Sequence, residues 1–267
     1  MITIRSPREI ETMRKSGKIT ARTLSRLIEA AKPGVTTGEL DRLAEDSIRA
    51  MGGVPTFKGY NGYPASICTS VNDQVVHGIP GEYVLREGDV LSIDIGTTFE
   101  GYVSDSAATL GIGSISAAAQ RLIRVTQECL MLAVAQMRSG NHLGDIGAAV
   151  QAHAEHHGYG VVRDLVGHGV GTKMHEEPQV PNYGKVGSGV LLRSGLVLAI
   201  EPMITEGTWR VHTLDDGWTV VTEDGKLAAH WEHTVAVTDQ GPRILTLRDA
   251  YEHEDAARYR PAEEVAA

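Results

Sequence analysis

Apolar residues recur every three or four positions through residues 7–31, and polar residues fill the positions between them. This spacing is typical of an amphipathic helix. Ser6, Pro7 and Glu9 supply the start that such a helix needs: a capping side chain, a proline in the first turn and a carboxylate that can bond back to the cap. After a Lys-Pro-Gly stop, the same spacing predicts a second helix over residues 37–51.

The second half of the chain repeats this order. Helical spacing runs over residues 117–137 and again over residues 143–156. Short apolar stretches between glycine-rich or charged turns predict strands at residues 66–70, 90–95, 107–111, 196–203, 218–221 and 233–237. Because the helices precede the strands within each half, we expect an α+β fold instead of a doubly wound sheet.

A sequence repeat relates the two halves. Residues 85–94 return as residues 192–201 with an offset of 107, and residues 34–40 return as residues 140–146 with an offset of 106. Two offsets that differ by one residue indicate a duplicated unit with one insertion.

The duplication predicts how the chain is organised. We expect a single catalytic domain over residues 1–250, made of pseudo-repeats at about residues 5–111 and 112–248 that pack around a pseudo-twofold axis. Asp94 and Glu201 occupy matched positions in the two repeats. They should therefore face each other across that axis.

Composition narrows the class of protein. The chain has 267 residues, of which 42% are hydrophobic and 22% charged, so it can bury a full core. A net charge of −9 gives no overall basic field, so neither nucleic acid nor a membrane is expected as a partner. The N-terminus lacks an apolar signal segment, which favours the cytoplasm. Residues 251–267 are polar, and we expect them to form a loose tail.

The two cysteines, Cys68 and Cys129, are too few for a disulfide framework or a cysteine-based zinc site. They fit a reducing compartment. Cys129 lies in an apolar helical stretch and is expected in the core. Cys68 lies in a strand that leads toward His77 and is a candidate pocket residue.

Several acidic residues stand in segments that otherwise predict buried strands. Asp94, Glu201 and Glu232 have apolar neighbours, and Asp105 follows Asp94 by eleven residues, which suits the partner strand of a hairpin. An isolated ionised carboxylate in such a place is strongly destabilising unless a cation or several donors compensate it. A single one could be matched by backbone amides or an arginine. Four of them, with no cluster of Lys or Arg in these segments, favour metal ions.

The charge and the donor atoms indicate what kind of metal site this would be. Four carboxylates carry a charge of about −4, which two divalent ions would neutralise. His168 is the expected nitrogen ligand, because the glycines around it would allow close approach. Oxygen-rich ligation with one imidazole suits Co, Mn, Fe or Zn.

Other histidines fall into two groups. His77 and His175 each stand three residues before a proline, and we expect them to flank the centre and to bond a substrate. His153, His156 and His157 lie on a polar helical stretch, where a solvated face is the expectation.

Five of these residues, in chain order, resemble the metal ligands of the methionine aminopeptidases, metallopeptidases with the pita-bread fold: Asp94, Asp105, His168, Glu201 and Glu232. Surrounding segments match as well, including Gly-Tyr-Asn-Gly-Tyr-Pro, His-Glu-Glu-Pro-Gln-Val and Asp-Gly-Trp-Thr-Val. The likeness extends over about residues 3–248. It is to the type I form, because Glu201 and Glu232 are too close for the helical insertion of type II.

The resemblance implies a role for each of these residues. Asp94, Asp105 and Glu232 would hold one metal ion, and Asp105, His168, Glu201 and Glu232 the other. The implied reaction removes the N-terminal methionine of nascent polypeptides with a small second residue, by attack of a metal-bridging hydroxide on the first peptide carbonyl.

The same resemblance implies how substrate is bound. Glu201 would shuttle the proton, His175 would stabilise the developing oxyanion, and His77 would bond the substrate near the scissile amide. The methionine pocket would be formed by Tyr60, Tyr63, Cys68 and Trp218. Met174 stands where the family often has Phe. A monomer that makes transient contact with the ribosome is expected.

Two other functions compete with this interpretation. A proline-directed peptidase of the pita-bread fold would use a similar core, but usually carries a further N-terminal domain. A non-catalytic member would bind a peptide or the ribosome through the same cleft, and typically lacks some of the ligands. All five are present here.

Overall fold

The computed structural model describes residues 2–248, so the predicted loose tail at 251–267 lies outside the described residues. The described part contains four α-helices, as predicted: α1 (Pro7–Ala30), α2 (Thr37–Ala50), α3 (Ala117–Ala135) and α4 (Leu143–His156). Ser6 and Glu9 form the expected capping box at the start of α1. No helix in this part of the chain has the length and apolar character needed to cross a membrane.

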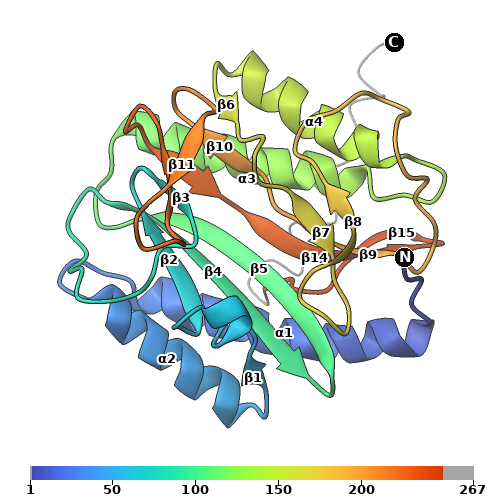
Figure 1. The fold of residues 1–267 in the computed structure, drawn as a ribbon, viewed down its shortest axis with the longest axis horizontal. Helices are drawn as coiled ribbons and strands as arrows, with labels where there is room; N and C mark the ends of the chain where they lie inside the picture. The colour runs from blue at the N-terminus through green and yellow to red at the C-terminus, as the bar shows by residue number, and fades with distance from the viewer. Residues whose placement is uncertain (1, 249–267) are drawn as a thin grey trace.

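The main sheet of residues 2–248 has nine strands in the order β1-β4-β5-β14-β9-β7-β8, with β2 beside β4 and β15 beside β14. Its strands are β1 (Val54–Pro55), β2 (Ile67–Val71), β4 (Val90–Phe99), β5 (Tyr102–Gly111), β7 (Gly167–Gly169), β8 (Glu176–Val180), β9 (Val197–Ile200), β14 (Glu232–Thr238) and β15 (Gly241–Ile244). The helix pairs α1/α2 and α3/α4 lie at opposite ends of this curved sheet (Figure 1).

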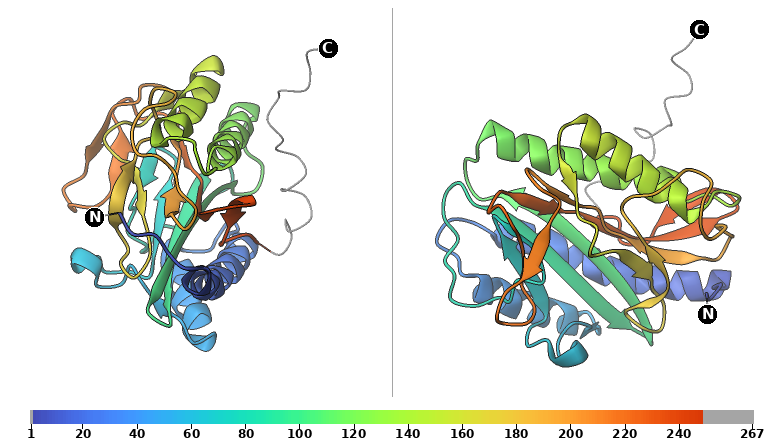
Figure 2. Two further views of the ribbon diagram at one scale, coloured as in Figure 1. Left: turned by 90° about the vertical axis from the view of Figure 1, so that its right-hand side faces the viewer. Right: turned by 45° about the horizontal axis from the view of Figure 1, so that its top comes forward.

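Two three-stranded sheets complete the described fold. One has the order β13-β10-β6 and the other β11-β12-β3. Their strands are β3 (Gln74–Val76), β6 (Gly160–Val161), β10 (Met203–Thr205), β11 (Val211–Thr213), β12 (Val220–Thr222) and β13 (Ala228–His230). In Figure 2 these short strands lie beside the long green β4–β5 hairpin, and β13 contacts both strands of that hairpin.

The two halves repeat one another's contacts. Helices α2 and α4 begin and end at positions related by an offset of 106. An isolated bridge joins Thr36 to Val84, directly before α2, and its counterpart joins His142 to Leu191, directly before α4. Each half thus ties the start of its second helix to the segment that enters its central strand. The α+β prediction and the helix-helix-strand order of both halves are confirmed.

Four predicted strands differ from the structure by more than one residue. The predictions at 90–95 and 107–111 cover only parts of β4 and β5. The stretch 196–203 is not continuous, because β9 ends at Ile200 and β10 starts at Met203. Pro202 has no N–H for the strand ladder, which accounts for the break. Trp218 lies in a bend, and β12 starts at Val220.

Two apolar clusters hold the fold around the site. The larger one joins the helices to the sheet through fully buried side chains such as Leu27, Ile93 and Leu122. A smaller one contains Phe57, Tyr63, Cys68 and Met174, among others. Because this second cluster adjoins the inner side of the sheet, it supplies apolar walls beside the polar residues described next.

Candidate metal centre and active site

Strand register places the candidate ligands in two adjacent rows across the sheet. Asp94 is opposite Ala107 in the β4–β5 pair, and Ala107 is opposite Glu232 in the β5–β14 pair. Ile200 is opposite His233, so Glu201, one residue further along, comes opposite Glu232. Cross-strand partners point to the same face of a sheet. The first row is therefore acidic, with one small residue inside it.

The second row lies two residues along the same strands. Asp105 is opposite Gly96 and exchanges two hydrogen bonds of 2.8 Å with Thr234, from its backbone N to Thr234 Oγ1 and from that hydroxyl to its backbone O. Thr234 is opposite Ala199, and Ala199 is opposite His168. Small neighbours separate the ligands in this row also. The five predicted ligands consequently converge, although they come from strands far apart in sequence.

Distances between donor atoms are short enough for shared ions. One ligand atom from each of Asp105, His168 and Glu232 lies within 4.8 Å of the other two. His168 Nε2 is 3.7 Å from Asp105 Oδ2 and 3.5 Å from Glu201 Oε1. The group is mostly buried, with Asp105 only 3% and Glu232 only 1% exposed.

His168 has the protonation pattern of a metal-binding imidazole. Its Nδ1 is 2.9 Å from the carbonyl oxygen of Gly169, so that nitrogen donates the proton. The lone pair is left on Nε2, which faces the carboxylates. Burial also lowers the pKa of His168, which favours the neutral form that ligates metals.

Without metal ions, ionising all four buried carboxylates is unfavourable, because their negative charges lie close together and away from water. Burial and the neighbouring carboxylates raise the pKa of Asp94, Glu201 and Glu232 well above their ordinary values. Burial raises the pKa of Asp105 to about 7, against the lowering effect of its contacts with Asp94 and Glu232. The charged or chargeable groups close to Asp105 and Glu201 are the imidazoles of His168 and His230.

Unpaired oxygens show that this cluster fits divalent cations. Asp94 Oδ1, Asp105 Oδ1 and Glu232 Oε1 are buried and have no hydrogen-bond partner among the described residues. Buried carboxylate oxygens without partners are rare in folded proteins. Oxygen donors around one imidazole are the set that Mn, Fe, Co and Zn accept.

A cavity of about 280 Å³ opens above this cluster. All five candidate ligands line this cavity, together with His77 and His175. His175 Nδ1 is 2.8 Å from the hydroxyl of Tyr60, and its ring centroid is 4.2 Å from that of His168. Burial lowers the pKa of His77 to about 4, so its ring is neutral near pH 7.

The predicted methionine-pocket residues also line this cavity. Tyr63 and Trp218 meet edge to face at 5.0 Å between ring centroids, and the Tyr63 hydroxyl donates to the carbonyl oxygens of Ile67 and Gly78. Cys68 is paired with Asp94 in the β2–β4 ladder. The wall beside the carboxylates is therefore aromatic and sulfur-containing.

His230 was not predicted from the sequence. It is 1% exposed, both ring nitrogens lack a hydrogen-bond partner among the described residues, and its Nε2 is 3.9 Å from Glu201 Oε2. The available signal was its position two residues before Glu232 on an extended segment, which places both side chains on one face. His230 does not line the cavity. Met203 and Leu165, which do, carry no sequence signal of their own.

The other histidine cluster has different surroundings. His153 Nε2 is 2.9 Å from Glu128 Oε2, and the His157 ring packs edge to face on that of His153. Arg124 donates to Glu128 and Arg121 to the carbonyl oxygen of His157. The single carboxylate is therefore already paired with one guanidinium group, and a second lies beside His157, which disfavours a metal ion and agrees with a solvated helix face.

A buried set of carboxylates with one imidazole, at the join of two half-sheets, is the arrangement of a metal-dependent hydrolase. Comparison with known proteins identifies the family. The model of metallopeptidase family M24 matches residues 11–239. The chain belongs to this family of metallopeptidases.

Individual relatives agree with this assignment. A methionine aminopeptidase of Clostridium acetobutylicum is 56% identical over 92% of this chain and 99% of its own length. Methionine aminopeptidase 1 of Mycobacterium tuberculosis is 48% identical over 91% of this chain and 94% of its own length.

Solved structures give the same family and confirm the pita-bread fold. The crystal structure of a methionine aminopeptidase from Thermotoga maritima has a TM-score of 0.91 and 45% identity, with 92% of this chain and 99% of that chain covered. An Xaa-Pro dipeptidase from Bacillus anthracis has a TM-score of 0.73 and 21% identity, with 91% and 61% covered, and shows the shared fold alone.

We expect the metal-free protein to lose stability as the pH rises from about 4 to 8. The four carboxylates have raised pKa values when folded, with Asp105 at about 7, and return to ordinary values near 4 when unfolded. The folded state therefore holds more protons in this window, and the stability present below pH 4 falls as the pH rises through the folded pKa values. Thermal unfolding of chelator-treated protein across this range measures the effect.

Divalent ions remove the same penalty, so the rise in unfolding temperature on adding Mn or Co should be larger at pH 8 than at pH 5. Metal-free stability that stays level or increases from pH 4 to 8 would contradict this account of the acidic row.

Proposed function

We propose that this chain is a type I methionine aminopeptidase, which removes the N-terminal methionine from nascent polypeptides with a small second residue. One observation carries the proposal: a buried acidic cluster with one imidazole forms the floor of a cavity whose wall is aromatic and sulfur-containing. A thioether side chain suits such a wall, because sulfur and aromatic rings are polarisable. The high identity to relatives named methionine aminopeptidase supports the same substrate.

The proposed cofactor is a pair of divalent ions, Co, Mn, Fe or Zn. Asp94, Asp105 and Glu232 would hold one ion, and Asp105, His168, Glu201 and Glu232 the other. Such a pair supplies an acidic water and polarises the scissile carbonyl when bound. The unpaired oxygens of Asp94, Asp105 and Glu232 support these assignments.

The proposed chemistry of the protein groups follows from their positions. Glu201 lies at the edge of the acidic row, past the end of β9, where its carboxylate can take a proton and return it to the leaving amine. The Tyr60 hydroxyl can donate to Nδ1 of His175, which leaves the proton on Nε2 to stabilise the oxyanion. His77 is neutral and can bond the substrate near the scissile amide.

Tyr60, Tyr63, Cys68 and Trp218 would bind the methionine side chain. Met174, which is 5% exposed, packs with Tyr63 and Cys68 in the same apolar cluster. A flexible thioether at this position fills the space behind the pocket without adding a polar atom.

We further propose that residues 1–250 form one catalytic domain that acts as a monomer in the cytoplasm and makes transient contact with the ribosome. The buried free thiols of Cys68 and Cys129 are consistent with a reducing compartment. The proline-directed alternative is less favoured, because the chain is 56% and 48% identical to the two relatives named methionine aminopeptidase and only 21% identical to the Bacillus anthracis dipeptidase. The non-catalytic alternative is less favoured, because every proposed ligand is present and lines one cavity.

The substrate proposal predicts a clear preference among short peptides. After reconstitution with each candidate metal, the protein should release methionine from Met-Ala-Ser and leave peptides of the form Xaa-Pro largely uncleaved. Product release is measured by chromatography. Faster hydrolysis of Xaa-Pro peptides would favour the proline-directed alternative, and an inert protein with every metal would favour a binding function.

Asp105→Ala should abolish turnover and reduce bound metal together, because the proposed role of Asp105 is to bridge both ions. Metal content is measured by mass spectrometry after dialysis, and activity with Met-Ala-Ser. Arg26→Ala, at an exposed position of α1, is a control that should keep both. Full activity of the Asp105→Ala protein would rule out a bridging role.

His77→Ala and His175→Ala should keep the metal content of the wild type but lose turnover. Removing one preorganised donor from an oxyanion typically lowers kcat by about 10²–10³. We expect the loss in kcat to exceed any change in KM for His175→Ala. Loss of metal in either variant would instead make that histidine a ligand.

A further inference from the structure

The segment before α1 brings a buried arginine against the loop that carries His175. Arg5 is 8% exposed, and its Nη2 donates to both carboxylate oxygens of Glu176, at 2.7 and 2.5 Å. Glu176 follows His175 directly in the chain. A charge-assisted contact between mostly buried groups, 171 residues apart, is strong and specific in geometry.

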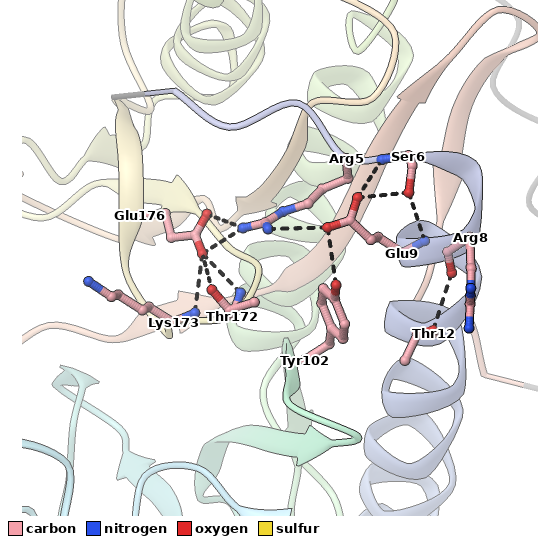
Figure 3. A network of polar contacts seen from close by, with 9 residues as sticks. All are labelled: Arg5, Ser6, Arg8, Glu9, Thr12, Tyr102, Thr172, Lys173 and Glu176. Atoms are coloured by element: carbon pink, nitrogen blue, oxygen red, sulfur yellow. Dashed lines mark hydrogen bonds and ion pairs between the residues drawn. The ribbon is translucent and has the colours of Figure 1, made fainter.

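The Glu176 carboxylate also accepts hydrogen bonds from the backbone of its own loop, residues 171–176. Glu176 Oε1 accepts hydrogen bonds from the backbone N–H groups of Thr172 and Lys173, at 2.9 and 3.2 Å. Gly171, at the start of the loop, lies against the Arg5 guanidinium so closely that a Cβ there would overlap it. Figure 3 shows the Glu176 carboxylate between two sets of donors, with Arg5 on one side and Thr172 and Lys173 on the other.

A second carboxylate holds Arg5 from the opposite direction. Arg5 Nη1 lies 3.7 Å from Glu9 Oε1. Glu9 is itself fixed, because it accepts from the Ser6 backbone N–H in the capping box of α1 and from the hydroxyl of Tyr102 on β5. The guanidinium therefore links α1, β5 and the 171–176 loop (Figure 3).

His175 itself has few other restraints. It belongs to a bend outside the regular strands, and its side chain is exposed. Tyr60 holds one ring nitrogen, and the ring packs on His168. Those contacts orient the ring. The backbone after His175 is held by the Gly169–Glu176 pair of the β7–β8 ladder, and the clamp formed by Arg5 and Glu176 holds the 171–176 loop from outside the cavity.

We propose that Arg5 is a positioning residue for catalysis, which acts through Glu176 to hold His175 at the reacting carbonyl. The inference rests on the function proposed for His175 above. Misplacement of a catalytic group by about 1 Å can cost about 10²-fold in rate. Loss of Arg5 would leave Glu176 without its cation and free the loop, so kcat should decrease while the metal ligands, which lie on the strands, stay in place.

A double-mutant cycle tests this coupling. The kcat, KM and metal content of four proteins are compared with Met-Ala-Ser: wild type, Arg5→Leu, His175→Ala and the double variant. Arg8→Leu is the matched control, because it removes an exposed arginine at the start of the same helix and leaves the contacts of Arg5, Glu9 and Glu176 in place. The assays are run well below the unfolding temperature of each protein.

Arg5→Leu should lower kcat by about 10- to 100-fold with KM and metal content nearly unchanged. In the His175→Ala background the same substitution should lower kcat by less than about twofold, because the group it positions is already absent. Arg8→Leu should keep the kcat, KM and metal content of the wild type. Equal losses in both backgrounds, or an unchanged kcat in Arg5→Leu, would overturn the proposal.

If Arg5→Leu does not fold, Arg5→Lys and Glu176→Gln replace it under the same criteria, since each keeps the size and polarity of the site. Both should lower kcat in the wild-type background and have little effect beside His175→Ala. Failure of the proposed function is seen separately, because it would appear as absence of methionine release by the wild-type protein before any variant is compared.

Discussion

The centre of this protein depends on one electrostatic constraint: carboxylates buried side by side need compensating positive charge. The first row of the sheet places Asp94, Glu232 and Glu201 on one face, and Asp105 lies in the next row. Burial raises the pKa of every member. A protein that only needed stability would gain from apolar side chains at these positions. The buried carboxylates therefore serve to bind cations, and the fold sets the affinity by holding them close together.

Much of the architecture could be predicted from the sequence because local signals agreed with one another. The capping residues Ser6 and Glu9, the helical spacing and the repeat placed all four helices to within a few residues. The repeat also predicted that acidic residues from both halves would converge, since matched positions in a duplicated fold lie near its axis. The hairpin that carries Asp94 and Asp105 was predicted from their spacing of eleven residues, although the strand predicted at 107–111 covered only the second half of β5.

Features that depend on register or on distant contacts were not predictable. Glu201 lies just beyond the end of β9, and the only local sign of this in the sequence is Pro202, which follows it directly. His230 stands two residues before Glu232, but the sequence does not show which strand lies beside it. Only the folded sheet places it next to Glu201. The pairing of Arg5 with Glu176 joins residues 171 positions apart, so a one-dimensional pattern carries no trace of it. Contacts of this kind become visible only when the chain is folded.

The register across the β5–β14 seam keeps the pattern of a twofold axis. Ala107 lies opposite Glu232, and Asp105 lies opposite Thr234. One strand thus has an acid where the other has a small residue, and the same contact returns two positions along with the roles exchanged. Two identical antiparallel strands related by a twofold axis pair in this way, because residue i faces residue j wherever residue j faces residue i. Each half of the chain therefore supplies one acid at the seam, and neither acid has to pack directly against the other.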